Sequence, residues 1–121
     1  MGLSQQGTDP SFIWDQDFPS PVTVCDMKGV IIAMNRRAAE NFTKWGGEKL
    51  IGTSLFACHS EPSNKIIRHL LASGEENVYV VQDRKGSRIV QQIPWYRGTK
   101  RAGLVEIITP FTGDIAIKKR T

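Results

Sequence analysis

Two histidines and two cysteines are the residues best able to do chemistry in this 121-residue sequence. Cys58 and His59 are neighbours in an irregular stretch before the longest predicted helix. A neutral imidazole there could ligate haem iron, and the thiolate is a second possible donor. His59 could equally hydrogen-bond a loop carbonyl or cap the entry of the helix. Both interpretations of His59 stay open on the sequence alone.

Motifs for catalysis and metal binding are otherwise missing from the sequence. It has no glycine-rich loop with phosphate-binding spacing, no His-Glu-x-x-His and no Cys-x-x-Cys. Structural zinc sites rarely take two ligands from sequence neighbours such as Cys58 and His59. We therefore expect no catalytic residues, no metal site and no enzymatic activity of the chain by itself.

Side chains on one long predicted strand, residues 88–97, could line a ligand pocket. Trp95 could pack in the core or stack on a flat ligand. Whichever glutamine faces inward, Gln91 or Gln92, needs a partner, because a buried amide without one costs about 1–3 kcal/mol. Glu106, on the last predicted strand, needs a cation or a ligand donor if its face is buried. Strand alternation divides residues 88–97 into two faces, one with Ile89, Gln91, Ile93 and Trp95 and the other with Val90, Gln92 and Tyr96.

A series of short strands and helices must position these residues. Asn35 can cap the first helix, and Ser63 can cap the longest one, which Gly74 ends. Tight turns between consecutive strands imply antiparallel pairing, so we expect an α+β fold with a five-stranded antiparallel sheet and short helices on one face. The predicted order is strands 22–25 and 30–34, helix 36–42, a helical turn 48–51, helix 64–73, and strands 77–82, 88–97 and 104–109.

The longest predicted helix should place His69 away from the core. Its apolar stripe centres well over a quarter-turn from His69 at helical spacing. A side chain on the outer side cannot reach a cofactor beneath the helix. The stripe consists of Ile66, Ile67, Leu70 and Leu71.

Length, composition and charge favour one soluble globular domain. Hydrophobic residues make up 40% and charged residues 23% of the 121 residues. The net charge is +4, but the basic residues are spread along the chain and only 118–120 form a dense run. We interpret this as a solvated surface with a basic tail and expect no nucleic-acid partner, since such binders gather cations on one face.

The sequence shows no signal for export or membrane insertion, which favours a cytoplasmic location. No stretch approaches the roughly 20 apolar residues of a membrane-spanning helix, and residues 1–10 lack the features of a signal peptide. Two cysteines do not suggest a disulfide framework, so we expect free thiols, a cytoplasmic location and no membrane contact. The large apolar residues between Phe12 and Phe18 should pack onto the domain or a partner chain.

The ordered set of local patterns resembles the PAS domain family. Residues 18–26 and 29–35 resemble its opening hairpin, where a strand ends in Asn and runs into an alanine-bearing helix. Residues 47–52 resemble its Glu-x-Leu-hydrophobic-Gly segment, and 103–108 resemble its final strand. Gly113-Asp-Ile resembles the Asp-Ile-Thr signature that follows that strand, with alanine in place of threonine. Leu50–Ser63, with Cys-His-x-x-Pro-Ser, is similar to a bacterial PAS subgroup associated with hemerythrin-like domains.

This resemblance implies a sheet whose concave face, roofed by short helices, can enclose a ligand. Family members bind haem, flavin, small metabolites or nothing, and commonly act as dimers. They signal to output domains such as a histidine kinase or a transcription regulator. The resemblance divides the chain into an N-terminal flanking segment (1–17), a PAS domain (18–115) and a basic tail or start of a signalling helix (116–121).

Flavin is a less favoured cofactor than haem on the same resemblance. Light-sensing relatives carry a reactive cysteine, within Asn-Cys-Arg, shortly after the glycine that matches Gly52. Here that stretch reads Thr53-Ser-Leu, and Cys58 arrives three residues late without a neighbouring arginine.

We therefore expect a cytoplasmic bacterial sensory domain, most simply a homodimer, that binds a small ligand or a partner and relays a signal. Its pocket candidates are Cys58, His59, Gln92 and Trp95. Two alternatives remain: a ligand-free dimerisation module, and a haem-based gas or redox sensor that uses His59.

Overall fold

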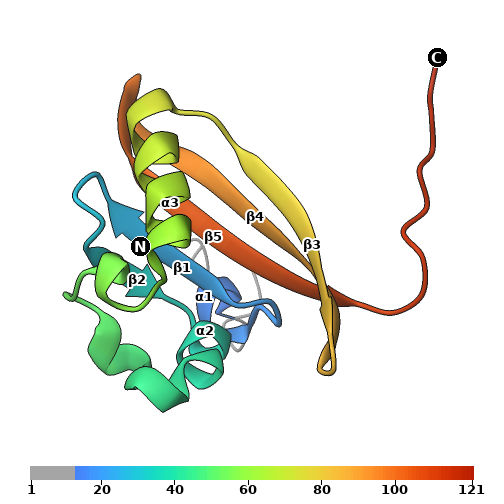
Figure 1. Cartoon of the computed structure of the whole chain (residues 1–121), viewed down its shortest axis with the longest axis horizontal. Coiled ribbons are helices and arrows are strands. Elements are labelled where there is room, and N and C mark those ends of the chain that lie inside the picture. Colours follow the sequence, from blue (N-terminus) through green and yellow to red (C-terminus); the bar gives the residue numbers. More distant parts are fainter. Residues whose placement is uncertain (1–12) are drawn as a thin grey trace.

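The fold is described by a computed structural model for residues 13–121. A five-stranded sheet forms one layer, and helix α3 lies across it (Figure 1). Shorter helices and turns fill the connection between β2 and α3. The elements are α1 (Trp14–Asp17), β1 (Val22–Asp26), β2 (Ile31–Met34), α2 (Arg36–Asn41), the 3₁₀ turns η2 (Thr43–Trp45), η3 (Gly47–Leu50) and η4 (Leu55–Ala57), α3 (Glu61–Ser73), β3 (Asn77–Asp83), β4 (Gly86–Arg97) and β5 (Lys100–Phe111).

The sheet has the strand order β2-β1-β5-β4-β3, with every neighbouring pair antiparallel. This confirms the predicted α+β class and the five-stranded antiparallel sheet. The polar loop predicted over 98–103 is wrong, because Lys100 and Arg101 already pair with β4. Only Gly98 and Thr99 separate the two strands, so β4 and β5 form one long hairpin.

Helix α3 begins earlier than its sequence pattern suggested. Ser60, not Ser63, is its N-cap, and the Ser60 hydroxyl accepts a hydrogen bond from the Ser63 amide at 3.4 Å. Pro62 fits the first turn, where its missing N–H would have had no partner. Gly74 ends the helix in the left-handed conformation, as predicted.

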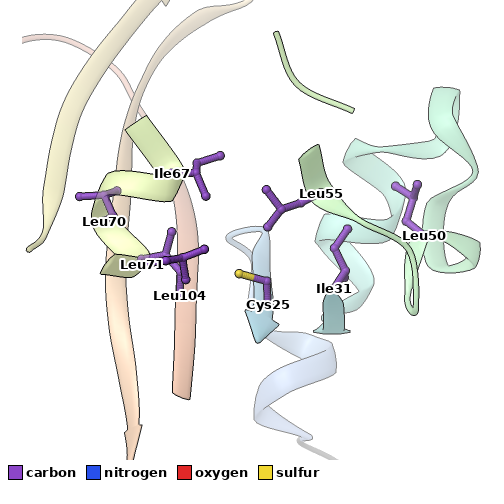
Figure 2. Packing of buried hydrophobic residues seen from close by; sticks show 8 residues of the cluster. All are labelled: Cys25, Ile31, Leu50, Leu55, Ile67, Leu70, Leu71 and Leu104. Atoms are coloured by element: carbon purple, nitrogen blue, oxygen red, sulfur yellow. The ribbon is translucent and has the colours of Figure 1, made fainter. Parts of the chain in front are cut away.

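The hydrophobic core lies between α3, the 3₁₀ turns and one face of the sheet (Figure 2). Ile67 of α3 is 4% exposed, whereas Ile66, which the sequence placed in the same stripe, is 49% exposed. The buried face of α3 carries Asn64 in its place. The eight core residues are Cys25, Ile31, Leu50, Leu55, Ile67, Leu70, Leu71 and Leu104.

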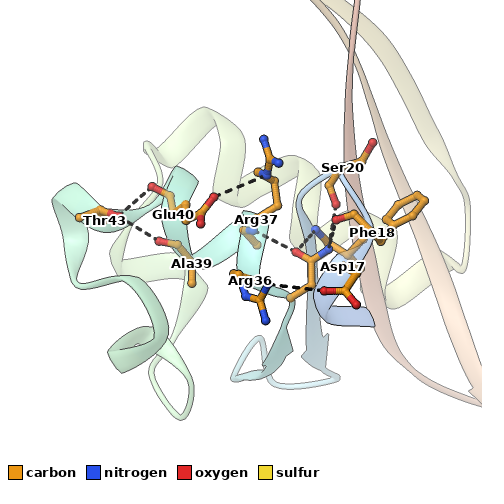
Figure 3. Close-up of polar contacts among 11 residues, drawn as sticks. Asp17, Phe18, Ser20, Arg36, Arg37, Ala39, Glu40 and Thr43 are labelled. Carbon is orange, nitrogen blue, oxygen red and sulfur yellow. Dashed lines mark hydrogen bonds and ion pairs between the residues drawn. The ribbon is translucent and has the colours of Figure 1, made fainter. Parts of the chain in front are cut away.

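Asn35 joins the segment before β1 to the start of α2. Its Oδ1 accepts hydrogen bonds from the Ala38 amide (2.9 Å) and the Val22 amide (3.0 Å), and its Nδ2 donates to the Ser20 carbonyl (2.9 Å). Nearby, the Arg36 guanidinium meets the Asp17 carboxylate at 3.5 Å, so α1 and α2 are also linked (Figure 3). The predicted N-cap role of Asn35 is confirmed.

The large apolar residues between Phe12 and Phe18 were predicted to pack onto the domain or a partner chain. Phe12 lies outside the described residues. Ile13 and Phe18 are 54% and 38% exposed, so neither is buried against the domain. Across residues 13–121, every helix is too short or too polar to cross a membrane.

Candidate ligand-binding site

A small cavity of about 60 Å³ lies between the sheet and its helical roof. Its apolar lining is made largely of core side chains, including Cys25, Ile31 and Leu104, and its polar groups come from the sheet and from the connection between η4 and α3. The inner lining is completed by Phe42, Leu50, Leu55 and Ile67, and the polar lining residues are Thr23, Cys58, His59, Gln92 and Glu106.

One row of polar side chains crosses four strands beside the cavity. The strand register pairs Thr23 of β1 with Glu106 of β5, Glu106 with Gln92 of β4, and Gln92 with Asn77 of β3. Asn77 Nδ2 donates to Gln92 Oε1 at 2.9 Å, and Gln92 Nε2 donates to Glu106 Oε2 at 3.1 Å. Gln92 is only 6% exposed, so these two bonds supply the partners that a buried amide needs. Gln92, rather than Gln91, is therefore the inward-facing glutamine.

His59 lies at the edge of the cavity, and a hydrogen bond to the backbone orients its ring. Its Nδ1 is 2.8 Å from the Leu55 carbonyl oxygen. Because a carbonyl only accepts, Nδ1 carries the hydrogen and Nε2 of the neutral ring keeps its lone pair. Asn64, buried in α3, donates from Nδ2 to the Phe56 carbonyl at 2.9 Å and so holds the η4–α3 connection that carries His59. Both predicted roles of His59, loop hydrogen bonding and lone-pair donation, fit this geometry.

A wider cleft of about 450 Å³ adjoins the cavity between α3 and the β3–β5 strands. Four residues line both spaces, so the cavity and the cleft meet at one rim: His59, Ile67, Gln92 and Glu106. The cleft has a mixed lining that also includes Ser63, Ile66, Asn77 and Tyr79. The sequence singled out Gln92, Glu106 and His59, but Thr23, Asn77 and Tyr79 join the site only through strand register.

The two cysteines line the cavity in different states. Cys58 is exposed, whereas Cys25 is 2% exposed at the centre of the core. Burial raises the pKa of the Cys25 thiol to about 11, because a thiolate there would lose its hydration. Cys25 was not among the predicted pocket residues. Its place in a short β-branched strand was the only signal that it would be buried.

Trp95, also predicted as a pocket candidate, lies on the other face of the sheet. Strand alternation places it opposite the buried Pro94, and the lining of the cavity does not include it. Its indole N–H donates to the Cys25 carbonyl at 2.9 Å. Gly103 makes this possible, because a Cβ at position 103 would collide with the Trp95 indole and the Cys25 carbonyl. His69 is exposed, as predicted, and its Nε2 lies 3.3 Å from Glu75.

Haem and flavin exceed the inner cavity. Pockets for drug-sized ligands span roughly 300–1,000 Å³, whereas this cavity measures about 60 Å³. Leu55 and Ile67, which are 8% and 4% exposed, occupy the space around the inner cavity. The inner cavity therefore fits a small molecule, or part of one.

Comparisons with known proteins agree with this architecture. A model of the PAS fold family matches residues 16–109. No curated protein matches the sequence. The Aer2 receptor from Vibrio cholerae, described as a dual PAS-haem oxygen sensor, is similar in structure with a TM-score of 0.62 and 13% identity, over 77% of this chain and 95% of that one.

Three further solved structures share the fold. VqmA of Vibrio cholerae, a LuxR-type receptor described as a dimer, has a TM-score of 0.67 and 16% identity over 93% of this chain, which spans about half (53%) of VqmA. VqmA bound to DPO has a TM-score of 0.66 and 16% identity, over 92% of this chain and 58% of that one. The PAS domain of the histidine kinase ThkA has a TM-score of 0.62 and 15% identity, over 74% of this chain and 97% of that one. Identities of 16% or less show a common fold and nothing about ligand.

Proposed function

Because this chain belongs to the PAS family, we propose that it is a sensory domain that binds a small ligand between its sheet and α3 and relays the binding to an output domain. The observation that carries the proposal is a satisfied polar row, Asn77–Gln92–Glu106, ending beside an apolar cavity. Natural cores bury polar groups reluctantly, and a ligand site is a common reason to retain them.

The relay follows from how the site is built. Ligand contacts at the rim involve α3 through Ile67 and the sheet through Gln92 and Glu106. A ligand that binds one arrangement of α3 over the sheet better than another shifts the population between them. The bound receptor VqmA and the kinase ThkA give precedents among similar structures for ligand binding and for a kinase output. For this chain we propose a bacterial signalling or transcription-regulating output, a cytoplasmic location and no catalysis of its own.

The outer face of the sheet supports the proposed homodimer. Strand register and alternation place the residues of this face on the side opposite the cavity. Val78 and Val80 are 57% and 49% exposed, and exposed clusters of β-branched residues mark interaction surfaces. We call this set the outer face: Val78, Val80, Ile89, Ile93, Val105 and Ile107.

Native mass spectrometry tests the proposed ligand binding. The chain is purified gently from its expression host, and its mass is measured under native and then denaturing conditions. We expect an additional small-molecule mass that denaturation releases. Glu106→Ala, which removes the end of the polar row, should lose it, and Glu48→Ala in η3, away from the cavity, should keep it. Equal retention by both variants would contradict the proposed location.

A second candidate is a ligand-free dimerisation module. The small cavity volume favours it, because side chains of the core already occupy most of the interior. Haemin titration addresses the third alternative, a haem sensor: a Soret band abolished by His59→Ala and kept by His69→Ala would establish ligation by His59. The size of the cavity leads us to expect no such band.

A further inference from the structure

The hydrogen bonds of the polar row all run in one direction. Asn77 donates to Gln92, and Gln92 donates to Glu106. An ionised carboxylate only accepts, so rotating the Gln92 amide by half a turn would set its oxygen against the oxygens of Glu106. The hydrogen bonds of the row can therefore run only from Asn77 toward Glu106. The free acceptor sites of the row lie on the Glu106 carboxylate.

Glu106 has more acceptor capacity than the protein uses. A carboxylate offers about four lone-pair sites, and Gln92 fills one of them. Glu106 takes part in none of the ion pairs formed within residues 13–121. It is half-buried, and its hydrogen-bond partner within residues 13–121 is Gln92. A donor or cation from outside would fill the remaining lone-pair sites.

The electrostatics of the cleft agree with the position of this charge. Burial raises the pKa of Tyr79, and the negative charge of Glu106 raises it further, while Arg88 opposes the rise. Arg88 itself is engaged by Asp83, with contacts of 3.0 and 3.1 Å. The Glu106 carboxylate is therefore the negative charge that acts on Tyr79 in the cleft. In the neutral tautomer that donates from Nδ1 to the Leu55 carbonyl, Nε2 of His59 is a second acceptor at the same rim.

From this geometry we infer that the site selects small molecules that carry a hydrogen-bond-donating cationic group on a short apolar chain, with primary alkyl amines as the simplest members, and that Glu106 receives the cationic group. The inference rests on the proposed ligand-binding function and specifies its chemistry.

The size of the cavity limits the apolar part. An engineered apolar cavity of about 150 Å³ holds benzene, whereas this one measures about 60 Å³. A short alkyl chain fits and an aromatic ring does not. Because Glu106 lines both the cavity and the cleft, a chain inserted toward Cys25 and Leu104 leaves its ammonium group at the carboxylate.

Three probes of equal length separate the head group from the chain. The ¹⁵N-labelled protein is titrated at neutral pH and constant ionic strength with propylamine, 1-propanol and propionate, and amide shifts are followed by NMR. We expect saturable shifts of Thr23, Gln92 and Glu106 with propylamine, and an affinity about tenfold or more above that for the alcohol and the acid, as a hydrogen bond to a charged group implies.

Two variants then test the assigned acceptor. Glu106→Gln keeps the shape and can still accept from Gln92, so it should raise the Kd for propylamine about tenfold or more. Glu48→Gln, on the exposed surface of η3, should leave the Kd unchanged. If Glu106→Gln fails to fold, the comparison of the three probes on the natural chain decides.

Propionate or propanol binding as tightly as propylamine would overturn the inference, and so would an unchanged amine Kd in Glu106→Gln or an absence of saturable amine binding. In each of these cases, native mass spectrometry that finds a ligand of another class leaves the proposed function standing. An empty cavity in every measurement removes both.

Discussion

At the scale of single residues, Asn35 shows how one short side chain can satisfy several backbone groups. Its amide accepts from two backbone N–H groups, of Val22 and Ala38, and donates to the Ser20 carbonyl. The residue is 4% exposed, so water cannot replace these bonds. The conformation of the chain on both sides of β1 therefore depends on it.

Replacing Asn35 by alanine should lower the free energy of unfolding by about 2–3 kcal/mol, since a helix cap is lost and buried backbone groups lose their partners. Urea denaturation monitored by circular dichroism measures the change. Asn41→Ala, at an exposed position on the same helix, is the matched control and should change stability little. Equal losses in the two variants would show that Asn35 acts only through helix propensity.

The buried thiol of Cys25 makes stability depend on alkaline pH. Its folded-state pKa is about 11, against an ordinary value of 9.0. Below pH 9 both states hold the proton, and the protein has its full stability. Between pH 9 and 11 the unfolded chain releases the proton while the folded chain retains it, so stability falls as pH rises.

This titration should remove about 2–3 kcal/mol of stability between pH 9 and 11. Urea melts of the natural chain and of Cys25→Ala across that range isolate the contribution, because other alkaline titrations are common to both proteins. Cys58→Ala, at the exposed cysteine, should show the same decline as the natural chain. A decline of equal size in Cys25→Ala would assign it to other groups.

At the scale of elements, Arg101 ties the end of α3 to β5. Its Nε donates to the Leu71 carbonyl at 2.9 Å, and its Nη2 donates to the Ala72 carbonyl at 2.8 Å. These carbonyls belong to the last turn of the helix, where intrahelical partners run out and the helix dipole favours a cation. The guanidinium thus fixes the helix that roofs the cavity to the strand that carries Glu106.

Arg101→Ala should destabilise the protein by about 1–3 kcal/mol and speed amide exchange in the last turn of α3. Arg101→Lys should recover part of the loss, because a single ammonium retains the charge but not the forked geometry. Hydrogen exchange read by NMR locates the effect. Arg84→Ala, in the exposed β3–β4 turn, serves as control. Equally fast exchange in the last turn of α3 in this control would contradict a local role of Arg101.

Sequence patterns predicted most of the elements, because turn residues and apolar periodicity are local signals. They could not choose between Gln91 and Gln92, since alternation puts one on each face and the choice depends on register. Asn77 and Glu106 settle it by pairing with Gln92 from neighbouring strands. Trp95, another predicted pocket candidate, lies on the opposite face from Gln92, and its indole donates to the carbonyl of Cys25, which is 70 residues away in sequence.

The start of α3 illustrates a limit of local signals. Ser60 and Ser63 both have side chains that can cap a helix, and the apolar stripe is compatible with either. Pro62 distinguishes the two possible starts of the helix. Proline is tolerated in the first turn of a helix, so the helix can begin at Glu61 with Ser60 as its cap. Ile66 is exposed because it lines the open cleft between α3 and the sheet. The apolar periodicity of the helix sequence does not show where this cleft lies.

At the scale of the whole molecule, the two faces of the sheet differ in the residues they carry. The inner face holds the cavity and the polar row, and the outer face presents β-branched residues to solvent. Any change in strand curvature at the polar row therefore reaches the outer face through the same backbones. A dimer formed there would sense the state of the cavity without a separate signalling element.

Val80→Lys on the outer face should shift the proposed dimer toward monomer, because a lysine would lose hydration in an apolar interface. Analytical ultracentrifugation of the natural chain and the variant at high micromolar concentration measures the shift. Ile51→Lys replaces another exposed apolar residue, in the turn after η3, and should leave association unchanged. A natural chain that sediments as a monomer would exclude the dimer altogether.

The strand order has a consequence for how the molecule is made. β5, the last strand to be synthesised, lies in the middle of the sheet between β1 and β4. Until residues 100–111 have left the ribosome, the β1–β2 hairpin and the β3–β4 hairpin have no partner that joins them, and the nascent chain exposes both. Ribosome-arrested chains ending before Lys100 should therefore remain sensitive to protease, and resistance should arise in one step once β5 has emerged.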